Sequence, residues 1–214
     1  MALSKVNFNS MNVTPAASKA IKFNSSNNGL ETGDLGGALV LISEQTASDS
    51  ASIQFTSGID STYKEYIFKY INCHPSVNIP HWTFQGSTNA GSSFGVTITS
   101  TNFNAYHAEN DSEAVIEYVA PGDLAQSTNY QRLLTEVNYS DDGSVSGALH
   151  LFEPSSTTFV KHFLATGNCQ DTEAMSRQGF TGGYFNTTSA INAVQFKMSS
   201  GNIDAGTITM YGVS

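Results

Sequence analysis

Hydrophobic and polar residues alternate in short segments along most of the chain, which is the pattern of half-buried β-strands. The clearest segment is 63–71, where Tyr66, Phe68 and Tyr70 share one face and charged or aliphatic residues occupy the other. Residues 191–198 repeat the alternation near the end of the chain. Both segments are therefore expected to be strands with one face in a core.

Segments rich in Gly, Ser and Asn separate the other candidate strands, as expected for turns. Further strands are expected at 38–42, 52–56, 81–84, 94–99, 115–119, 148–152, 158–164 and 207–211. The run 38–42 is continuously apolar, so we expect it to be buried on both faces. Residues 123–134 have only weak helical periodicity, which predicts a loop or one short helix.

Many short strands with almost no helical signal predict an all-β, antiparallel β-sandwich, and we favour a jelly-roll-like version whose first and last strands pair. The sandwich is expected to span residues 37–214. Residues 1–36 are rich in Asn and Ser and predict an extended N-terminal arm. Within that arm, the alternation around Ile21 and Phe23 predicts a short strand before the Asn27–Gly29 turn.

The charge balance excludes several partners. The 214 residues, of 22.8 kDa, contain 9 Lys and Arg against 18 Asp and Glu, a net charge of −9. A surface that grips phosphates needs a basic excess, so we expect neither nucleic acid nor an anionic membrane as a partner. The N-terminus lacks the apolar stretch of a signal peptide, and no segment is long enough to span a bilayer. We expect a chain made in the cytoplasm.

The two cysteines, Cys73 and Cys169, are far apart in sequence and form neither a redox pair nor a zinc ribbon. Two free thiols are expected, and a disulfide between them stays open as an alternative. Cys73 could bind zinc together with His74 and His81, but their spacing is not that of a known zinc site. A structural role is the favoured interpretation, so no metal is expected.

Other candidate chemistry is weak. Alternating acidic residues at Glu109, Asp111 and Glu113 could bind calcium, but they lack the spacing of an EF-hand and predict a solvated loop. The chain has no nucleophile elbow, phosphate-binding loop, zinc-protease helix or dinucleotide fingerprint. We therefore expect no catalytic residues and no cofactor.

Most aromatic residues occupy alternating strand positions and are expected in the core. Three tyrosines, Tyr106, Tyr130 and Tyr184, fall instead in segments that we expect to be loops. An aromatic ring on a loop can contact a sugar or a protein partner. These three are the candidate contact residues of the chain.

Four segments resemble uncharacterised virion structural proteins of tailed phages, especially phages of marine cyanobacteria. They are residues 12–75, 123–133 (DLAQSTNYQRL), 146–163 (SGALHLFEPSSTTFVKHF) and 183–214 (GYFNTTSAINAVQFKMSSGNIDAGTITMYGVS). The resemblance implies a non-enzymatic virion component, such as a capsid-decoration, neck or tail-fibre protein. Its expected partners are other virion proteins and copies of itself.

We expect such a component to assemble as a homo-oligomer through its N-terminal arm and its sheet edges. A lectin-like fibre tip that binds host-surface glycans through the three tyrosines is the alternative. An enzyme that degrades host polysaccharide is least favoured, because it would need two carboxylates about 5–10 Å apart and nothing in the sequence selects such a pair.

Overall fold

The computed structural model describes residues 20–26, 28–33 and 38–214. The chain divides into two units, Met1–Ala38 with Ser214 and Leu39–Val213. In the first unit, β1 (Ala20–Phe23) and β2 (Leu30–Gly33) pair as an antiparallel hairpin. This confirms the strand expected around Ile21 and Phe23. The rest of the expected arm lies mostly outside the described residues.

The second unit contains twelve strands and one short 3₁₀ turn, η2 (Ala120–Gly122). The strands are β3 (Leu39–Thr46), β4 (Ile53–Phe55), β5 (Glu65–Pro75), β6 (Trp82–Ser87), β7 (Ile98–Ala108), β8 (Ala114–Tyr118), β9 (Gln131–Leu134), β10 (Val145–Phe152), β11 (Lys161–Gln170), β12 (Met175–Phe185), β13 (Ala193–Met198) and β14 (Ile203–Val213). No helix in the described part of the chain is long and apolar enough to cross a membrane.

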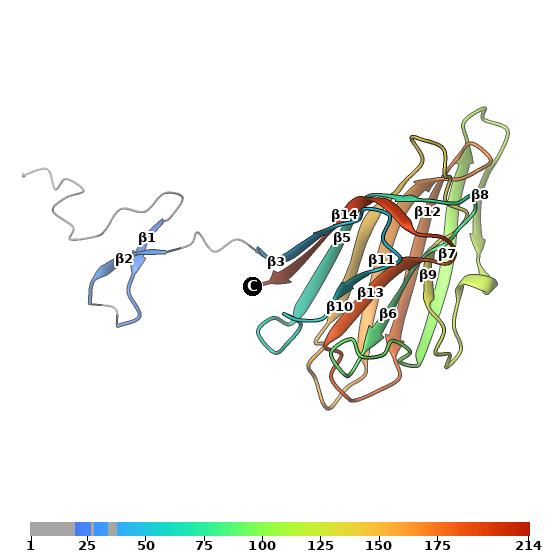
Figure 1. Cartoon of the computed structure of the whole chain (residues 1–214). Helices are drawn as coiled ribbons and strands as arrows, with labels where there is room; N and C mark the ends of the chain where they lie inside the picture. Colours follow the sequence, from blue (N-terminus) through green and yellow to red (C-terminus); the bar gives the residue numbers. More distant parts are fainter. Residues whose placement is uncertain (1–19, 27, 34–37) are drawn as a thin grey trace, which may run out of the picture. The chain divides into compact units, whose positions relative to one another are not determined.

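These strands form two antiparallel sheets that pack as a sandwich (Figure 1), as expected. The large sheet has the order β3-β14-β5-β10-β11-β12-β7-β8, and the small sheet has the order β4-β13-β6-β9. The first strand of the unit pairs with the last, and the second pairs with the next to last, which is the nested pairing of a jelly roll. Four strands, β11, β12, β7 and β8, extend the large sheet beyond this jelly-roll set.

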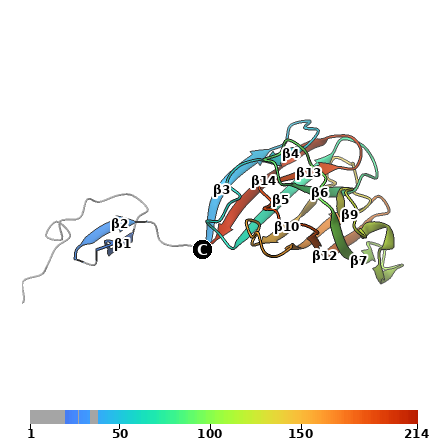
Figure 2. The ribbon, with the colours of Figure 1, turned by 90° about the horizontal axis from the view of Figure 1, so that it is seen from below.

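The core lies between the two sheets, and Figure 2 shows the large sheet curving around the small one. Trp82 stacks on Phe196 with ring centroids 5.7 Å apart, and Phe68 and Phe84 pack around the same pair. All four side chains are fully buried. Residues 63–71 supply Phe68 to this core from the aromatic face that the sequence predicts.

Several predictions of local structure are wrong in part; for example, the strand expected at 158–164 begins only at Lys161. The run 38–42 starts β3, but β3 is an edge strand and Leu41 is 56% exposed rather than buried on both faces. Residues 94–97 precede β7 and lie outside it. Residues 123–134 form neither a helix nor a simple loop, because they end in β9, the outer strand of the small sheet. The sequence reading also missed β12.

Candidate functional site on the outer face of the large sheet

The four-stranded sheet covers one face of the large sheet, and within residues 39–213 no other sheet covers the opposite face. Burial alternates strictly along β11, where Phe163 and Ala165 are buried and Leu164 is 55% exposed. Opposite residues of neighbouring antiparallel strands share a face. The same outer face therefore carries Phe103, which is 43% exposed, and Ile116, which is 78% exposed.

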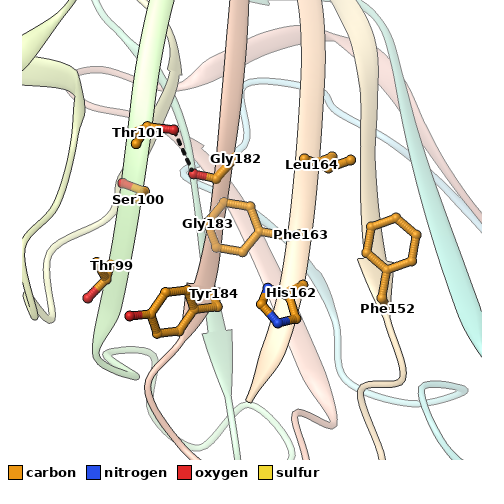
Figure 3. Close-up of a pocket in the computed structure, with 10 residues that line it drawn as sticks. All are labelled: Thr99, Ser100, Thr101, Phe152, His162, Phe163, Leu164, Gly182, Gly183 and Tyr184. Atoms are coloured by element: carbon orange, nitrogen blue, oxygen red, sulfur yellow. Dashed lines mark hydrogen bonds between the residues drawn. The ribbon is translucent and has the colours of Figure 1, made fainter. Parts of the chain in front are cut away.

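A shallow cavity lies in this outer face where one strand position lacks a side chain. Gly182 of β12 pairs with Leu164 on one side and with Thr101 on the other, so the row is interrupted at the glycine. The resulting cavity measures about 450 Å³ (Figure 3). Ten residues line it: Thr99, Ser100, Thr101, Phe152, His162, Phe163, Leu164, Gly182, Gly183 and Tyr184.

Aromatic rings form the wall of this cavity nearest the end of β12. Tyr184 lies opposite His162 in the register, with ring centroids 5.8 Å apart, as Figure 3 shows. Phe152 lies on β10, with its ring 6.4 Å from that of His150. His150 is itself held by Glu65, whose carboxylate oxygen lies 2.6 Å from Nδ1. The wall is thus mainly aromatic, and no acidic residue lines the cavity.

The three candidate tyrosines lie at three separate places. Tyr184 lines the cavity at the end of β12, and Tyr106 lies within β7, so the expectation that both lie in loops is wrong. The Tyr106 ring lies 4.8 Å from the Arg177 guanidinium, opposite it in the register. Tyr130 precedes β9 in a loop, as expected, and contacts the small sheet. No single contact surface unites them.

Arg177, which contacts the Tyr106 ring, is the centre of an ion cluster in which Arg177 and Asp171 are buried and Glu117 and Glu136 are partly exposed. Its Nη2 lies 2.8 Å from Oδ2 of Asp171 and 3.0 Å from Oε2 of Glu136, and its Nη1 lies 3.9 Å from Glu117. The carboxylate of Asp171 also accepts backbone N–H groups in the turn before β12. Because Asp171 binds both Arg177 and these backbone groups, it anchors the turn.

The residues considered for metal binding lie apart. Cys73 is buried, His74 Nδ1 contacts the carbonyl oxygen of Gly143 at 2.5 Å, and His81 Nδ1 accepts the N–H of Glu136 at 3.3 Å. In residues 20–26, 28–33 and 38–214, no group of three or more His, Cys, Asp or Glu side chains could hold a metal ion.

The acidic residues between β7 and β8 contact different neighbours. Glu109 accepts a hydrogen bond from Gln170 at 3.2 Å. Asp111 lies 3.1 Å from His107, and Glu113 lies 3.4 Å from the Tyr106 hydroxyl. Each carboxylate is thus oriented by its own partner, and the segment forms a loop, as expected.

The two cysteines are free and buried. Val145 of β10 pairs with Cys73 on one side and with Cys169 on the other, so the Cα atoms of the two cysteines lie two strand spacings apart, about 9.5 Å. This exceeds the reach of a disulfide, which removes that alternative. Burial raises the pKa of each thiol to about 12, so neither forms a reactive thiolate at neutral pH.

Comparison of this chain with protein-family models, curated proteins and solved structures finds no match.

The sequence analysis did not identify Phe152, His162, Leu164 or Gly182 as residues that line a cavity. The available signal was Gly182-Gly183 inside an alternating segment, because glycine in a strand marks a place where another group approaches closely. That signal is recognisable only once β12 is identified as a strand.

Proposed function

We propose that this chain is a non-enzymatic structural component of a tailed-phage virion, which assembles with further copies of itself. The observation that carries this proposal is the uncovered apolar face of the large sheet, with Leu164, Phe103 and Ile116 exposed on it. Soluble proteins rarely leave such surfaces free, and exposed apolar patches mark interaction sites. The resemblance of four segments to virion proteins supports the particle as the setting.

A second copy of the chain is the partner that the charge distribution favours. With a net charge of −9, two copies repel each other wherever their acidic surfaces meet. On the outer face, however, Glu65 is paired with His150, and Lys69 lies over the ring of Tyr211. Contact through this face therefore buries apolar side chains with little like-charge repulsion, and closed symmetric pairs are the usual result.

Sedimentation equilibrium of the full-length chain tests self-association. Leu164→Glu and Ile116→Glu each place a charge on the outer face and should convert oligomers to monomers. Tyr139→Glu is the matched control, because Tyr139 is 52% exposed outside the strands. A monomeric wild-type chain at tens of micromolar, or equal dissociation by the control, would contradict assembly through this face.

The virion setting is tested separately by immunogold electron microscopy of purified particles. Label at one defined position on the capsid, neck or fibres is the expected result. Protein abundant in lysate with no label on particles would reject the virion role, whatever the oligomeric state.

A lectin-like role in binding host-surface glycans is the second candidate function. The observation that favours it is a polar cavity beside Tyr130, which lies on the small sheet, away from the uncovered face of the large sheet. The arrangement of charges in that cavity decides which glycans it could bind.

A further inference from the structure

The cavity beside Tyr130 holds two cations in register. Arg132 of β9 and Lys197 of β13 both pair with Thr83 of β6, so the two side chains flank the same threonine. Their neighbours Phe84 and Phe196 point into the core, which places the cations on the opposite, outer face of the small sheet. The cavity measures about 290 Å³ and is lined by Thr83, Pro121, Gly122, Leu124, Asn129, Tyr130, Arg132, Lys197 and Ser199.

None of these lining residues is acidic, although the chain carries twice as many acidic as basic residues. Among the described residues, neither Arg132 nor Lys197 has a carboxylate within ion-pair distance, whereas Lys64 and Arg177 are both paired. Two carboxylates near Arg132 in the sequence are already engaged. The Asp123 carboxylate accepts a hydrogen bond from the Tyr118 hydroxyl at 2.5 Å, and the Glu136 carboxylate forms an ion pair with Arg177 at 3.0 Å.

Two like charges that face one cavity repel each other, and an anion bound between them removes that repulsion. Arginine offers a planar pair of N–H donors that matches a carboxylate or a sulfate oxygen pair, and lysine adds a point charge. The charge pattern therefore points to an anionic ligand.

The Lys197 ammonium is held in place by aromatic contact. It lies 4.1 Å from the centroid of the Tyr130 ring, within the range of a cation–π interaction. The Tyr130 hydroxyl donates to Oε1 of Gln195, whose amide in turn donates to Ser52 Oγ at 2.8 Å. Burial raises the pKa of Tyr130, so the phenol stays neutral. The ring and the ammonium over it are thus fixed before any ligand arrives.

Buried glutamines fix the backbone on both sides of the cavity. Gln85, fully buried, donates to the carbonyl oxygens of Thr128 at 3.1 Å and Asn129 at 2.9 Å. Gln131, also fully buried, donates to the carbonyl oxygen of Gly122 at 2.7 Å. A site held by such a supporting layer loses little entropy on binding.

We propose that this cavity binds one acidic sugar unit, carrying a carboxylate or a sulfate ester, of a surface polysaccharide. The anionic group lies between Arg132 and Lys197, and the sugar hydroxyls meet the neutral side chains of Asn129 and Ser199 at the rim. The volume is at the lower end for ligand pockets, which suits a single sugar ring. This inference rests on the second candidate function and is independent of assembly through the large sheet.

The test is calorimetric titration of the full-length chain with glucuronate, glucose 6-sulfate and neutral glucose. At least one of the two acidic sugars should bind, and glucose should not. The acidic sugar that binds more tightly shows whether the cavity prefers a carboxylate or a sulfate ester. Arg132→Gln and Lys197→Met should each weaken binding about 10- to 100-fold, because each removes a charge-assisted contact. Lys64→Gln, which removes the same charge from an exposed ion pair, should leave binding unchanged.

A second readout comes from His81. Burial lowers its pKa, and the positive charge of Arg132 lowers it further. An anion at Arg132 should therefore raise the His81 pKa in an NMR titration, and glucose should not.

Several results would overturn the proposal: no binding of either acidic sugar at millimolar concentration, equal binding of glucose, or equal loss in Lys64→Gln. Tighter binding of a tetraglutamate peptide would assign the cavity to acidic protein segments instead. Unchanged sedimentation of the Arg132 and Lys197 variants would show that any loss of binding is separate from assembly.

Discussion

The inner face of the large sheet has two different halves. Under the jelly-roll strands it is aromatic, with Phe68 and Tyr70 packed against Phe196 of the small sheet. Phe163 and Phe185 of the added strands continue this core beside Phe84, but under β7 the inner face is polar, because Asn102 and Asn104 are both buried there. One continuous sheet thus carries two kinds of interior.

The difference follows from what covers each half. The small sheet ends at β9, so residues 119–130, which connect β8 to β9, lie against part of β7. A loop has backbone groups without sheet partners, and these need hydrogen bonds when buried. Gln131 donates one to the carbonyl oxygen of Gly122 in this loop at 2.7 Å, and Asn102 donates to the carbonyl oxygen of Arg132, at the start of β9, at 3.2 Å.

This comparison teaches that a jelly roll can be widened without enlarging its second sheet, provided that the new inner face is polar. The arrangement is incompletely satisfied, because Oδ1 of Asn102 and of Asn104 are buried with no hydrogen-bond partner in the structure. Unpaired buried acceptors cost stability. The aromatic half should therefore contribute most of the folding free energy.

The largest effect is expected from Phe196→Ala in the aromatic half. Phe196 contacts Trp82, Phe68 and Phe84, so its removal leaves a cavity that the surrounding rings cannot fill. Unfolding in urea should show a loss of about 3–5 kcal/mol. Phe103→Ala on the outer face is the control, and a similar loss there would contradict the contrast.

Asp171→Ala should give the next largest loss, from the polar half. Asp171 is buried and accepts two hydrogen bonds from Arg177, at 2.8 and 3.1 Å, so its removal leaves a buried guanidinium with weaker partners. The free energy of unfolding should fall by about 3 kcal/mol in the same urea assay. This is near the lower end of the range for breaking a buried ion pair, because Glu136 still pairs with Arg177. Glu153→Ala breaks only the exposed pair with Lys64 and should cost less than about 1 kcal/mol.

The sequence predicts the aromatic half well and the polar half poorly. In residues 63–71 and in β13, apolar and polar residues alternate with a period of two. This alternation identifies both the strand and its buried face, because the apolar side chains on that face pack into the core. β9 and β12 carry Gln131, Arg177 and Gly179 at inner positions, so their buried faces do not look apolar. Gln131 is buried there with Gly122 of the loop as its partner, and Arg177 with Asp171, and both partners are supplied by the tertiary structure.

The candidate sites show the same limit. Tyr130 and Tyr184 were selected as aromatic residues in loops, and both line cavities, although Tyr184 lies in a strand. The placement of Arg132 and Lys197 at one cavity is not predictable, because it depends on both residues pairing with Thr83 of the strand between them. Residues 65 positions apart carry no local signal that the fold brings them to the same cavity.

Glycine substitutions should separate close packing from open surface within β12. A Cβ added at Gly179 would lie 2.4 Å from the carbonyl oxygen of Leu133, so Gly179→Ala must push β9 away. Urea unfolding should show a loss of about 1–3 kcal/mol. At Gly182 the nearest atom is the flexible Cδ2 of Leu164, at 3.3 Å, so Gly182→Ala should change stability by less than about 1 kcal/mol while partly filling the outer cavity. Equal losses at the two positions would show that β9 does not press on the sheet.

The smallest expected effect is a pH dependence from His81, which directly precedes β6 of the small sheet. Burial lowers the pKa of His81 in the folded chain, with a further decrease from Arg132 and an opposing contribution from Glu136. The unfolded chain therefore binds the proton first, so stability is complete above the ordinary histidine pKa of about 6.5 and decreases as the pH falls below it. In His81→Gln the urea midpoint should decrease less between pH 7 and pH 5 than in the wild type. Glutamine is the chosen replacement because it preserves a hydrogen-bond acceptor for the N–H of Glu136 but cannot take up the proton. An identical decrease of the urea midpoint in both proteins would therefore assign the pH dependence to other groups.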